Sequence, residues 1–516
     1  MTANLSRMLT RQRLRRPDQP AVIESDTSKV TTFAELDGRV HAVAAGLREQ
    51  GVGPGSLVGI LAPNRIEFVL TLFAVARLGG VTVPLNVRLH PEELAYVADH
   101  AGITTLVVDG GLAEAGEALA RRAAGVERQV GIGDGLPEGW WSFAELEDRG
   151  GGQQVPDAHV GLDDPQRVLY TSGTTSRPKG VTITHGNAVF NHLAQITELE
   201  LTAADRFLVS APLYHVAAID GPGLTCLYLG GAIVLTPDFH PQTMLRATIE
   251  HRVTGMILPH PVILGMIDEP PDPTELTEHV RWVIFAGLAP SEIERLRTRV
   301  FPTARMVESL GMTEYTSGIA YLDARNERAK AGSAGVTVHH ADLRVVDETG
   351  VERPAGEVGE FVARGPKVTT GYWREPERNR EAFDNGWLRT GDMGYIDEDG
   401  YAWFVDRKKH MIRSGGENIA AAEVERVLLE HPAVVEAAVI PTPHPTWGEV
   451  PKAVVVASGP EHPTADELVE HCRSMLARFK CPKAVSFVEQ LPRNHSGKVL
   501  KNELAQRERE QTEGSP

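Results

Sequence analysis

Residues 171–180 read Thr171-Ser172-Gly173-Thr174-Thr175-Ser176-Arg177-Pro178-Lys179-Gly180 and directly follow a short apolar run at residues 168–170. Glycines let backbone N–H groups approach an anion closely, hydroxyl groups add hydrogen-bond donors, and a lysine supplies positive charge. The apolar run predicts a strand that opens into this loop, and the combination favours phosphate binding over an ordinary solvated turn. The stretch differs from the GxxxxGK[ST] loop because no Ser or Thr follows Lys179.

The chain before this loop alternates between short apolar runs and helical patterns. The runs at residues 56–61, 81–84 and 104–108 predict buried strands, and residues 67–77 predict an amphipathic helix. Such alternation is typical of α/β layers with a largely parallel sheet. Residues 110–152 are rich in Gly, Glu and Arg, so we expect peripheral loops and a helix there. The predicted fold class is therefore α/β.

The pattern changes from Asp342 onward, where short strand-like segments such as residues 345–347 and 360–362 are separated by Gly and Asp. This spacing predicts a β-rich subdomain. The charged stretch Asp406-Arg407-Lys408-Lys409 lies shortly before the glycine pair Gly415-Gly416 and is predicted to be a linker. About a hundred residues remain after it, which is enough for a small independent domain. A chain of 516 residues also exceeds what one hydrophobic core usually supports, so two or more domains are expected.

The net charge argues against several classes of partner. Lys and Arg total 52 against 69 Asp and Glu, which gives a net charge of −17. An acidic surface argues against nucleic acid or an anionic membrane as the main partner, because both attract basic faces. The longest uncharged apolar stretch, residues 223–235, is too short to span a bilayer.

The cysteines and the first residues indicate the compartment. Cys226, Cys472 and Cys481 are few, odd in number and without CxxC spacing, so they give no zinc or disulfide signal. That usage is typical of a reducing cytoplasm. Residues 1–16 contain several arginines but no apolar run follows them, which does not match a signal peptide. We therefore expect a soluble cytoplasmic protein.

Further motifs follow residues 171–180 in a definite order along the chain. They are Leu310-Gly311-Met312-Thr313-Glu314, Gly386-Trp387-Leu388-Arg389-Thr390-Gly391-Asp392, Asp406-Arg407-Lys408-Lys409, Gly415-Gly416-Glu417-Asn418-Ile419 and Gly497-Lys498. The ordered set resembles the signature motifs of the adenylate-forming superfamily, which includes acyl-CoA synthetases, adenylation domains of peptide synthetases and luciferases. The resemblance extends over nearly the whole chain. It implies activation of a carboxylic acid by ATP, a reaction that needs cations and hydrogen-bond donors around the phosphates.

The resemblance implies that the loop at residues 171–179 holds the β- and γ-phosphates of ATP. Thr174 and Thr175 would donate hydroxyl groups and Lys179 would add charge. Glu314 would position Mg²⁺, which prefers oxygen ligands and keeps several waters. The other residues implied to contact the nucleotide here are Thr171, Ser172, Gly173, Gly311, Met312 and Thr313, of which Thr313 would lie near the α-phosphate.

The resemblance also assigns roles near the end of the chain. Asp392 would accept hydrogen bonds from the ribose hydroxyls, with Arg407 as a second ribose contact. Lys409 stands where the family has its hinge, and Lys498 would reach the carboxylate and the α-phosphate during adenylation. The implied architecture is a large N-terminal domain at residues 1–406, made of layered α/β subdomains and a β-rich subdomain. A hinge at residues 407–409 joins it to a small mobile α+β domain at residues 410–516.

The acyl pocket is expected around His215, Asp220, Gly287 and Gly311. The resemblance gives His215 the place of a gating residue beside the pocket, whereas an isolated histidine in an apolar segment can also be a satisfied core residue. Asp220 has two interpretations. A carboxylate facing the acyl chain would bind the ammonium group of an amino-acid substrate, because an unpaired buried carboxylate is costly. Otherwise Asp220 caps the following helix or turn.

Some residues depart from the family pattern. Leu310 stands where most relatives have a tyrosine that stacks on adenine, so adenine binding is expected to be weaker or supplied by another surface. Leu288 replaces a glycine and would either narrow the pocket or pack in the core. His410 replaces an acidic residue after the hinge. None of these changes removes a residue implied to bind phosphate, magnesium or ribose.

We therefore expect an ATP-dependent, AMP-forming acid–thiol ligase that uses Mg²⁺. The leading interpretation is an acyl-CoA synthetase that activates a small or medium carboxylic acid and transfers it to CoA. The alternative is a free-standing adenylating enzyme for a (β-)amino acid that loads the phosphopantetheine arm of an acyl carrier protein, with Asp220 binding the amino group. A luciferase-type oxygenase would need a special acceptor pocket that nothing in the sequence indicates. A non-catalytic nucleotide-binding regulator is disfavoured by the intact Lys179, Glu314 and Lys498.

Overall fold

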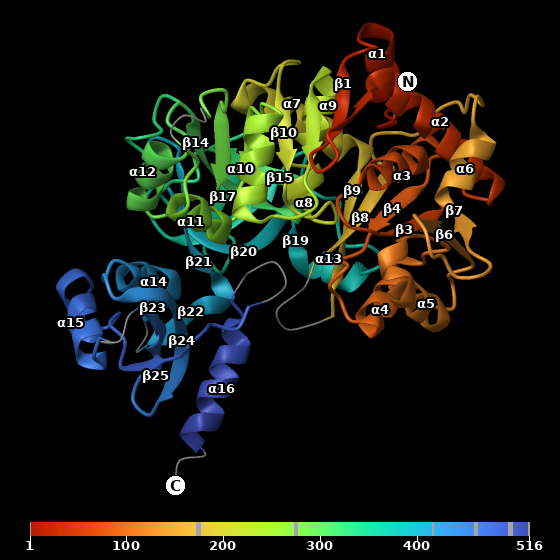
Figure 1. Ribbon diagram of the computed structural model, residues 1–516. Helices are drawn as coiled ribbons and strands as arrows, with labels where there is room; N and C mark the ends of the chain where they lie inside the picture. Colours follow the sequence, from red (N-terminus) through yellow and green to blue (C-terminus); the bar gives the residue numbers. More distant parts are fainter. Residues whose placement is uncertain are drawn as a thin grey trace. The chain divides into compact units, whose positions relative to one another are not determined.

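A computed structural model describes residues 2–171, 177–272, 277–414, 417–458, 463–493 and 499–513 (Figure 1). The chain divides into two compact units. The larger comprises Met1–Leu343 and Ala363–Leu388, and the smaller comprises Arg344–Val362 and Arg389–Pro516. Among the described residues, no helix is both long enough and apolar enough to cross a membrane.

The first sheet of the larger unit has seven strands in the order β7-β6-β5-β3-β4-β8-β9. Their bounds are β3 (Leu57–Leu61), β4 (Val81–Pro84), β5 (Thr105–Asp109), β6 (Arg128–Ile132), β7 (Trp141–Ser142), β8 (Pro165–Thr171) and β9 (Lys179–Thr184). The predicted strands at residues 56–61, 81–84 and 104–108 are confirmed, as is the helix at residues 67–77, which is α3 (Ile66–Arg77). All strand pairs in this sheet are parallel except β8 with β9, which form an antiparallel hairpin.

The prediction for residues 110–152 was wrong in part. This segment holds α5 (Ala113–Arg122) and α6 (Phe143–Gly150), but also β6, which pairs with β5 inside the sheet. Only Val130 and Ile132 of β6 are apolar and buried, so the strand has too few apolar residues to show an alternating pattern. The strand is stabilised by its pairing with β5, which the local sequence pattern does not reveal.

The second sheet of the larger unit has nine strands in the order β16-β15-β14-β13-β12-β10-β11-β1-β2. Strands β1, β11, β10, β12, β13 and β14 are parallel to one another, so their carboxyl ends lie at one edge. The bounds are β1 (Pro20–Glu24), β2 (Lys29–Thr32), β10 (Arg206–Val209), β11 (Ala232–Leu235), β12 (Gly255–Ile257), β13 (Trp282–Phe285), β14 (Arg305–Met312), β15 (Ser317–Tyr321) and β16 (Val336–Thr337). The apolar stretch at residues 223–235 forms most of α9 (Pro222–Leu229) and all of β11.

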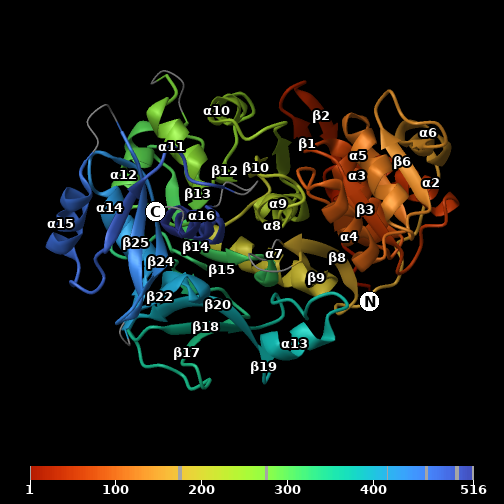
Figure 2. The same cartoon turned by 90° about the horizontal axis from the view of Figure 1, so that it is seen from below.

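Helices cover both faces of this sheet, and alternate strand residues point to opposite faces. Phe207 and Val209 of β10 join a core that also contains residues of α9 and of α2 (Phe33–Glu49) and α3. Leu208, between them, joins a second core under α10 (Pro241–Glu250), α11 (His260–Asp268) and α12 (Pro290–Arg299) (Figures 1 and 2). The first core includes Val58 and Ile60 of β3 as well, so it holds the two sheets of the larger unit together.

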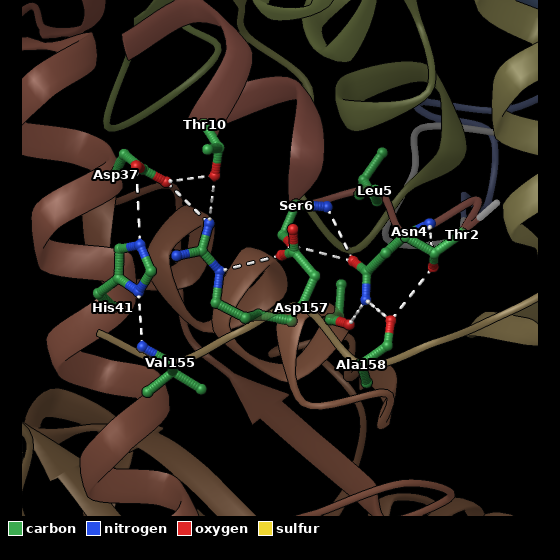
Figure 3. A network of polar contacts seen from close by, with 12 residues as sticks. Thr2, Asn4, Leu5, Ser6, Thr10, Asp37, His41, Val155, Asp157 and Ala158 are labelled. Carbon is green, nitrogen blue, oxygen red and sulfur yellow. Dashed lines mark hydrogen bonds and ion pairs between the residues drawn. The ribbon is translucent and has the colours of Figure 1, made fainter. Parts of the chain in front are cut away.

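The remaining helices of the larger unit complete its layers. They are α1 (Arg7–Arg15), α4 (Pro91–Ala101), α7 (His185–Leu199), α8 (Val216–Ile219) and α13 (Pro376–Ala382). A buried polar network fixes α1 and the segment before β8 against α2 and α3 (Figure 3). In it, Arg77 of α3 donates to Asp37 of α2 (Nη2–Oδ1 2.8 Å), and its Nε lies 3.4 Å from Asp157 Oδ1.

The smaller unit contributes β21 (Ala402–Arg407), which pairs antiparallel with β20 (Trp387–Ile396) over residues 392–396. Strands β17 (Asp342–Val346), β18 (Gly359–Arg364) and β19 (Phe383–Asp384) complete that sheet, in the order β17-β18-β20-β19. A further sheet in the order β23-β22-β25-β24, with β26 on β25, carries helices α14 (Ala421–Leu429), α15 (Ala465–Met475) and α16 (Lys501–Glu513). Its strands are β22 (Met411–Ser414), β23 (Glu417–Ala420), β24 (Val434–His444), β25 (Gly448–Ala457) and β26 (Ala484–Phe487). The stretch predicted as a linker is shorter than expected, because a three-residue 3₁₀ turn (Lys408–His410) connects β21 to β22.

Candidate active site

The predicted site residues of the larger unit follow the carboxyl ends of parallel strands. The phosphate loop follows β8, His215 lies after β10, Gly287 lies after β13, and Glu314 lies after β14. Ligands of open α/β sheets bind at this edge, because the loops there converge and the strands fix where each loop begins. The topology therefore gives these residues the positions that a binding site requires.

The phosphate loop connects β8 to β9, which pair as an antiparallel hairpin. Thr171 and Lys179 are direct cross-strand partners, so they close the two ends of the loop. Ser172, Gly173, Thr174 and Thr175 lie outside the described residues. The Thr171 hydroxyl is buried and has no hydrogen-bond partner in the described part of the chain. A buried hydroxyl without a partner at the mouth of this loop is a donor that a phosphate oxygen can satisfy.

Lys179 and Glu314 meet at the end of this loop. The Lys179 ammonium donates to Glu314 Oε1 at 2.7 Å and to the Tyr372 hydroxyl at 2.8 Å. Tyr372 in turn donates to the same Oε1 at 2.9 Å, and Lys179 Nζ lies 4.3 Å from the centroid of its ring. The Glu314 side chain is nearly buried, whereas a quarter of the Lys179 side chain is exposed. The three side chains form a closed triangle with an exposed cation at one corner.

The chain around Glu314 is held in an unusual conformation. After β14, Thr313 to Tyr315 make a 3₁₀ turn, and the next two residues, Thr316 (φ +54°) and Ser317 (φ +90°), lie in the left-handed region although neither is glycine. Such positions are costly and persist where surrounding structure fixes them. Here Thr316 Oγ1 donates to the Lys367 carbonyl at 2.9 Å, and the Thr369 N–H donates to the Glu314 carbonyl at 2.7 Å. The turn aims the Glu314 side chain towards Lys179.

The other residues of this motif have different environments. Gly311 is exposed, Met312 is half-buried and Thr313 is buried. Leu310 is buried at 7% exposure, so it packs within the protein and does not present an aromatic face to adenine. A side chain at Gly311 would approach the Ser317 carbonyl to 3.1 Å, so glycine keeps this surface open.

Residues 366–373 form a segment, here called the strap, that joins the Glu314 turn to the β8–β9 hairpin. Its hydrogen bonds to β9 run from Thr182 N to Gly371 O (3.1 Å), from Thr369 Oγ1 to Thr182 O (2.6 Å) and from Trp373 N to Gly180 O (2.7 Å). Asn187 Nδ2 of α7 donates to the carbonyls of Pro366 (2.9 Å) and Val368 (3.0 Å). The strap therefore fixes Tyr372 relative to both Lys179 and Glu314.

His215 precedes α8 and caps it. Its Nδ1 accepts the Ala217 N–H at 3.3 Å, so the neutral ring carries its proton on Nε2. The residue is exposed, yet desolvation by the protein around it lowers its pKa below the ordinary value. An exposed ring that is surrounded by protein and stays neutral at physiological pH can face a substrate as a hydrogen-bond donor.

The Asp220 side chain neither caps the following helix nor presents an open carboxylate. It is 1% exposed and forms an ion pair with Arg167 of β8, which is fully buried. The carbonyl of Asp220 accepts from Asn191 Nδ2 and Gln195 Nε2, both at 2.8 Å. The helix that follows, α9, begins at Pro222, and its N-cap residue is Gly221, which provides no side-chain cap. Asp220 is thus already paired inside the protein.

Gly287 directly precedes Leu288 in the loop after β13. Gly287 is exposed with φ +71°, a conformation that favours glycine. Leu288 is buried within the core under α10, α11 and α12, so it packs and does not narrow a pocket.

The two residues expected to bind ribose meet within the smaller unit. Asp392 of β20 and Arg407 of β21 are direct cross-strand partners, and Arg407 Nε lies 2.5 Å from Asp392 Oδ1. Asp392 is 1% exposed, while a third of the Arg407 side chain is exposed. Gly391 before Asp392 has φ +71°, and its N–H donates to Glu360 Oε1 at 3.1 Å. The strands thus place a buried carboxylate and an accessible guanidinium side by side.

The expected hinge residue Lys409 lies in the 3₁₀ turn between β21 and β22, where it lines a cavity of about 400 Å³ beside α16. His410 Nδ1 lies 3.5 Å from Asp406 Oδ1, so the histidine at this position pairs with the aspartate that precedes the turn. Lys498 and Gly497 lie outside the described residues, as do Gly415 and Gly416.

Sequence reasoning missed Tyr372 and Arg167. Tyr372 lies in Gly371-Tyr372-Trp373, which looks like any aromatic pair after a glycine, and 58 residues separate it from Glu314. Arg167 precedes the apolar run before the phosphate loop, and nothing in its spacing links it to Asp220, 53 residues later. Neither contact has a signal in the sequence, because both depend on how distant strands come together.

The comparisons with known proteins agree with this geometry. A family model described as AMP-binding enzyme matches residues 9–373, and a model of the AMP-binding enzyme C-terminal domain matches residues 423–498. A feruloyl-CoA synthase of Amycolatopsis sp. is 39% identical over 485 residues, covering 92% of this chain and 94% of that protein. An indoleacetate–CoA ligase of Aromatoleum aromaticum is 35% identical over 478 residues, covering 92% of each. The structure of o-succinylbenzoate CoA synthetase from Bacillus subtilis in complex with its acyl-adenylate intermediate superimposes with a TM-score of 0.85 at 31% identity, covering 96% of this chain and 97% of that one.

Proposed function

The chain belongs to the family of AMP-binding enzymes and is an AMP-forming acid–thiol ligase that uses ATP and CoA, and from this premise we propose which side chains carry each part of its reaction. The observation that carries the proposal is the Lys179–Glu314 pair at the closed end of the phosphate loop. CoA-ligase relatives support CoA as the thiol, and they do not favour a carrier protein. The paired state of Asp220 also gives an amino-acid substrate no free carboxylate.

The first half-reaction joins the acid to AMP. A carboxylate oxygen attacks the α-phosphorus, the bond from that phosphorus to the bridging oxygen breaks, and pyrophosphate leaves. Both reactants are anions, so positioned positive charge and donors lower the barrier. We assign phosphate binding to Thr171, Lys179 and the loop residues Ser172, Gly173, Thr174 and Thr175. Thr313, which is buried at the end of β14, is assigned to the α-phosphate.

Glu314 has the chemistry that a magnesium site needs. Both hydrogen bonds that the described side chains make to its carboxylate end on Oε1, which leaves Oε2 to take a cation. One carboxylate together with phosphate oxygens and water satisfies Mg²⁺. When bound, Mg²⁺ would neutralise charge on the phosphates. Hydrogen bonds from Tyr372 and Lys179 fix the orientation of the Glu314 side chain.

The remaining roles belong to other parts of the chain. Asp392 and Arg407 are proposed to bind the ribose hydroxyls, since a carboxylate accepts from a vicinal diol and Arg407 already orients it. Lys498 is proposed to contact the carboxylate and the α-phosphate, and Lys409 to be the hinge between domains at residues 1–406 and 410–516. In the second half-reaction the CoA sulfur bonds to the acyl carbon, the bond to AMP breaks, and the thiol proton is released.

The acid is proposed to carry an aromatic acyl group, because the two curated relatives described above act on feruloyl and indoleacetate groups by name. His215, with its proton on Nε2, would donate to the carboxylate or to a polar group of the acid. Gly287 and Gly311 would line the same pocket. We place the reaction in the cytoplasm, where the three free cysteine thiols stay reduced.

The test is acid-dependent exchange of pyrophosphate into ATP, followed by thioester formation with CoA. The panel contains ferulate, indoleacetate, 2-succinylbenzoate, octanoate and the β-amino acid analogues of the simple acids. We expect exchange with an aromatic acid and a thioester product only with CoA. Exchange with no member of the aromatic set but with octanoate would refute the substrate class, and preference for the amino acids would restore the carrier-protein alternative.

A further inference from the structure

We propose that Tyr372 is a positioning residue that keeps Glu314 oriented for the cation while Lys179 changes partners on nucleotide binding. This inference rests on the roles proposed for Lys179 and Glu314. It explains how the Glu314 carboxylate stays available to a cation although the Lys179 ammonium bonds to it. The closed triangle of hydrogen bonds among the three side chains carries it.

The Lys179–Glu314 pair presents a conflict. Each group is assigned to the nucleotide or its cation, yet in the structure they bond to each other at 2.7 Å. When a triphosphate binds, Lys179 must redirect its ammonium towards phosphate oxygens. Glu314 then loses a charged donor, although the carboxylate stays largely buried. A buried carboxylate without a donor would be costly and free to rotate.

Tyr372 resolves this conflict because its hydroxyl contacts both partners. It donates to Glu314 Oε1 at 2.9 Å, so one donor remains on that oxygen when the lysine leaves. With Oε1 occupied, Oε2 continues to face the cation.

The tyrosine also guides the lysine. Its hydroxyl oxygen accepts from Lys179 Nζ at 2.8 Å, and its ring lies 4.3 Å from the ammonium. A cation beside an aromatic ring is stabilised at a range of positions, so the ammonium can shift towards a phosphate without losing the ring.

Tyr372 is itself fixed by the strap. Its N–H donates to Asn379 Oδ1 at 2.6 Å, and its carbonyl accepts from Asn379 Nδ2 at 3.0 Å. The residue is 6% exposed and bridges to Val181 of β9. A side chain with this support holds its place while the lysine moves, which is what a positioning residue requires.

The test is Tyr372→Phe, which removes the hydroxyl and keeps the ring. The matched control is Tyr170→Phe. Tyr170 lies on β8 opposite Gly180, which is the residue after Lys179. Its hydroxyl bonds to His100 Nδ1 at 2.6 Å and is not part of the triangle. Each variant loses one hydrogen-bonded tyrosine hydroxyl close to the β8–β9 hairpin, from the half-buried Tyr170 or from the buried Tyr372. The readout is the Mg²⁺ concentration that gives half-maximal pyrophosphate exchange at saturating ATP and acid.

We expect Tyr372→Phe to raise this Mg²⁺ concentration by about tenfold, the scale for losing a partner that orients a metal ligand, with the unfolding midpoint within a few degrees of Tyr170→Phe. Tyr170→Phe should leave the Mg²⁺ dependence unchanged. Adding Tyr372→Phe to Glu314→Gln should raise the half-maximal Mg²⁺ concentration little further than Glu314→Gln alone, because the hydroxyl acts through the carboxylate.

Other outcomes distinguish a failure of the positioning role of Tyr372 from a failure of the proposed function. Equal Mg²⁺ dependence in wild type and Tyr372→Phe, with exchange intact, overturns the positioning role and leaves the proposed function standing. A wild-type protein that shows no acid-dependent exchange removes the proposed function itself. An equal shift in Tyr170→Phe would mean that any lost hydroxyl in the hairpin has this effect, which also overturns the role of Tyr372.

Discussion

Lys179 and Glu314 are 135 residues apart in sequence and lie at the ends of strands of different sheets, yet their charged atoms lie 2.7 Å apart. Lys179 begins β9 of the seven-stranded sheet, and Glu314 lies in the turn after β14 of the nine-stranded sheet. The strap bonds to both, through Thr369 to the Glu314 carbonyl and through Trp373 to Gly180. The pair is therefore a product of how two sheets are joined, and it stands at the carboxyl edge where both present their loops.

Removing either member of this pair should disable adenylation. We expect Lys179→Met and Glu314→Gln each to lower pyrophosphate exchange by roughly 100-fold or more, because each removes charge assigned to the phosphates or to the cation. Steady-state exchange across ATP and Mg²⁺ concentrations measures the effect. Lys179→Met should act mainly on ATP and Glu314→Gln mainly on Mg²⁺. Equal effects of the two variants on both parameters would contradict the separate roles.

Breaking the Arg167–Asp220 pair should destabilise the protein without changing its choice of acid. Asp220→Asn leaves a fully buried guanidinium uncompensated, which costs about 3–5 kcal/mol of unfolding free energy. Urea unfolding measures this. The control is Asp342→Asn. Asp342 and its partner Arg364 are both exposed, so this substitution should cost less than about 1 kcal/mol of unfolding free energy.

The substrate profile of Asp220→Asn decides between the two interpretations of this residue. With a structural role, the ratio of activity on plain acids to activity on amino acids stays as in wild type. A selective loss of amino acids in the variant would show that Asp220 binds an ammonium group despite its pairing with Arg167.

The family motifs allowed much of this site to be predicted from sequence, and the tertiary contacts explain the rest. Lys179, Glu314, Asp392 and Arg407 were singled out by motif, and the structure brings them together in two pairs. Tyr372 could not be found, because a tyrosine after a glycine carries no signal until the strap places it. Asp220 was noticed as an unusual carboxylate, but its partner Arg167 is on a strand whose pairing the local sequence does not specify. The buried strands were predicted where most of their residues are apolar, and β6 was missed because only Val130 and Ile132 of its five residues are apolar and buried.

Acid should destabilise the larger unit through its buried histidines. Burial, and secondarily Arg167, lowers the pKa of His192 from 6.5 to about 3. The folded protein therefore keeps this histidine neutral between those values while the unfolded chain binds a proton, so stability falls as pH drops below about 6.5. Between pH 6.5 and 5 the single group accounts for about 1.6 kcal/mol of unfolding free energy.

Urea unfolding of wild type and His192→Gln at the two pH values isolates this contribution. The variant should lose that part of the pH dependence, whereas His159→Gln, at an exposed position, should retain it. His192 bonds to Thr225 Oγ1 at 2.9 Å, so His192→Gln is expected to be less stable at both pH values. The difference between the two pH values carries the test, and an unchanged difference would contradict the assignment.

Lys498 is assigned to the first half-reaction alone, and this makes the sharpest prediction for the C-terminal part of the chain. A lysine that contacts the carboxylate and the α-phosphate stabilises charge that exists only while the adenylate forms. Lys498→Ala should therefore lower pyrophosphate exchange by roughly 100-fold or more while the binding of ATP changes little. Equilibrium binding of ATP and the exchange rate, measured on the same preparation, separate these two quantities.

The second half-reaction provides the internal control for Lys498→Ala. Supplied with a preformed acyl-adenylate, the variant should transfer the acyl group to CoA at close to the wild-type rate in a single turnover, because the thiol attacks the acyl carbon after pyrophosphate has left. Loss of both half-reactions to the same degree would mean that Lys498 supports the structure of the small domain and has no specific part in adenylation. Loss of the first half-reaction alone requires a residue whose contribution ends when the adenylate is made. A lysine fits this behaviour, because its long side chain brings a compact charge to the α-phosphate for that one step.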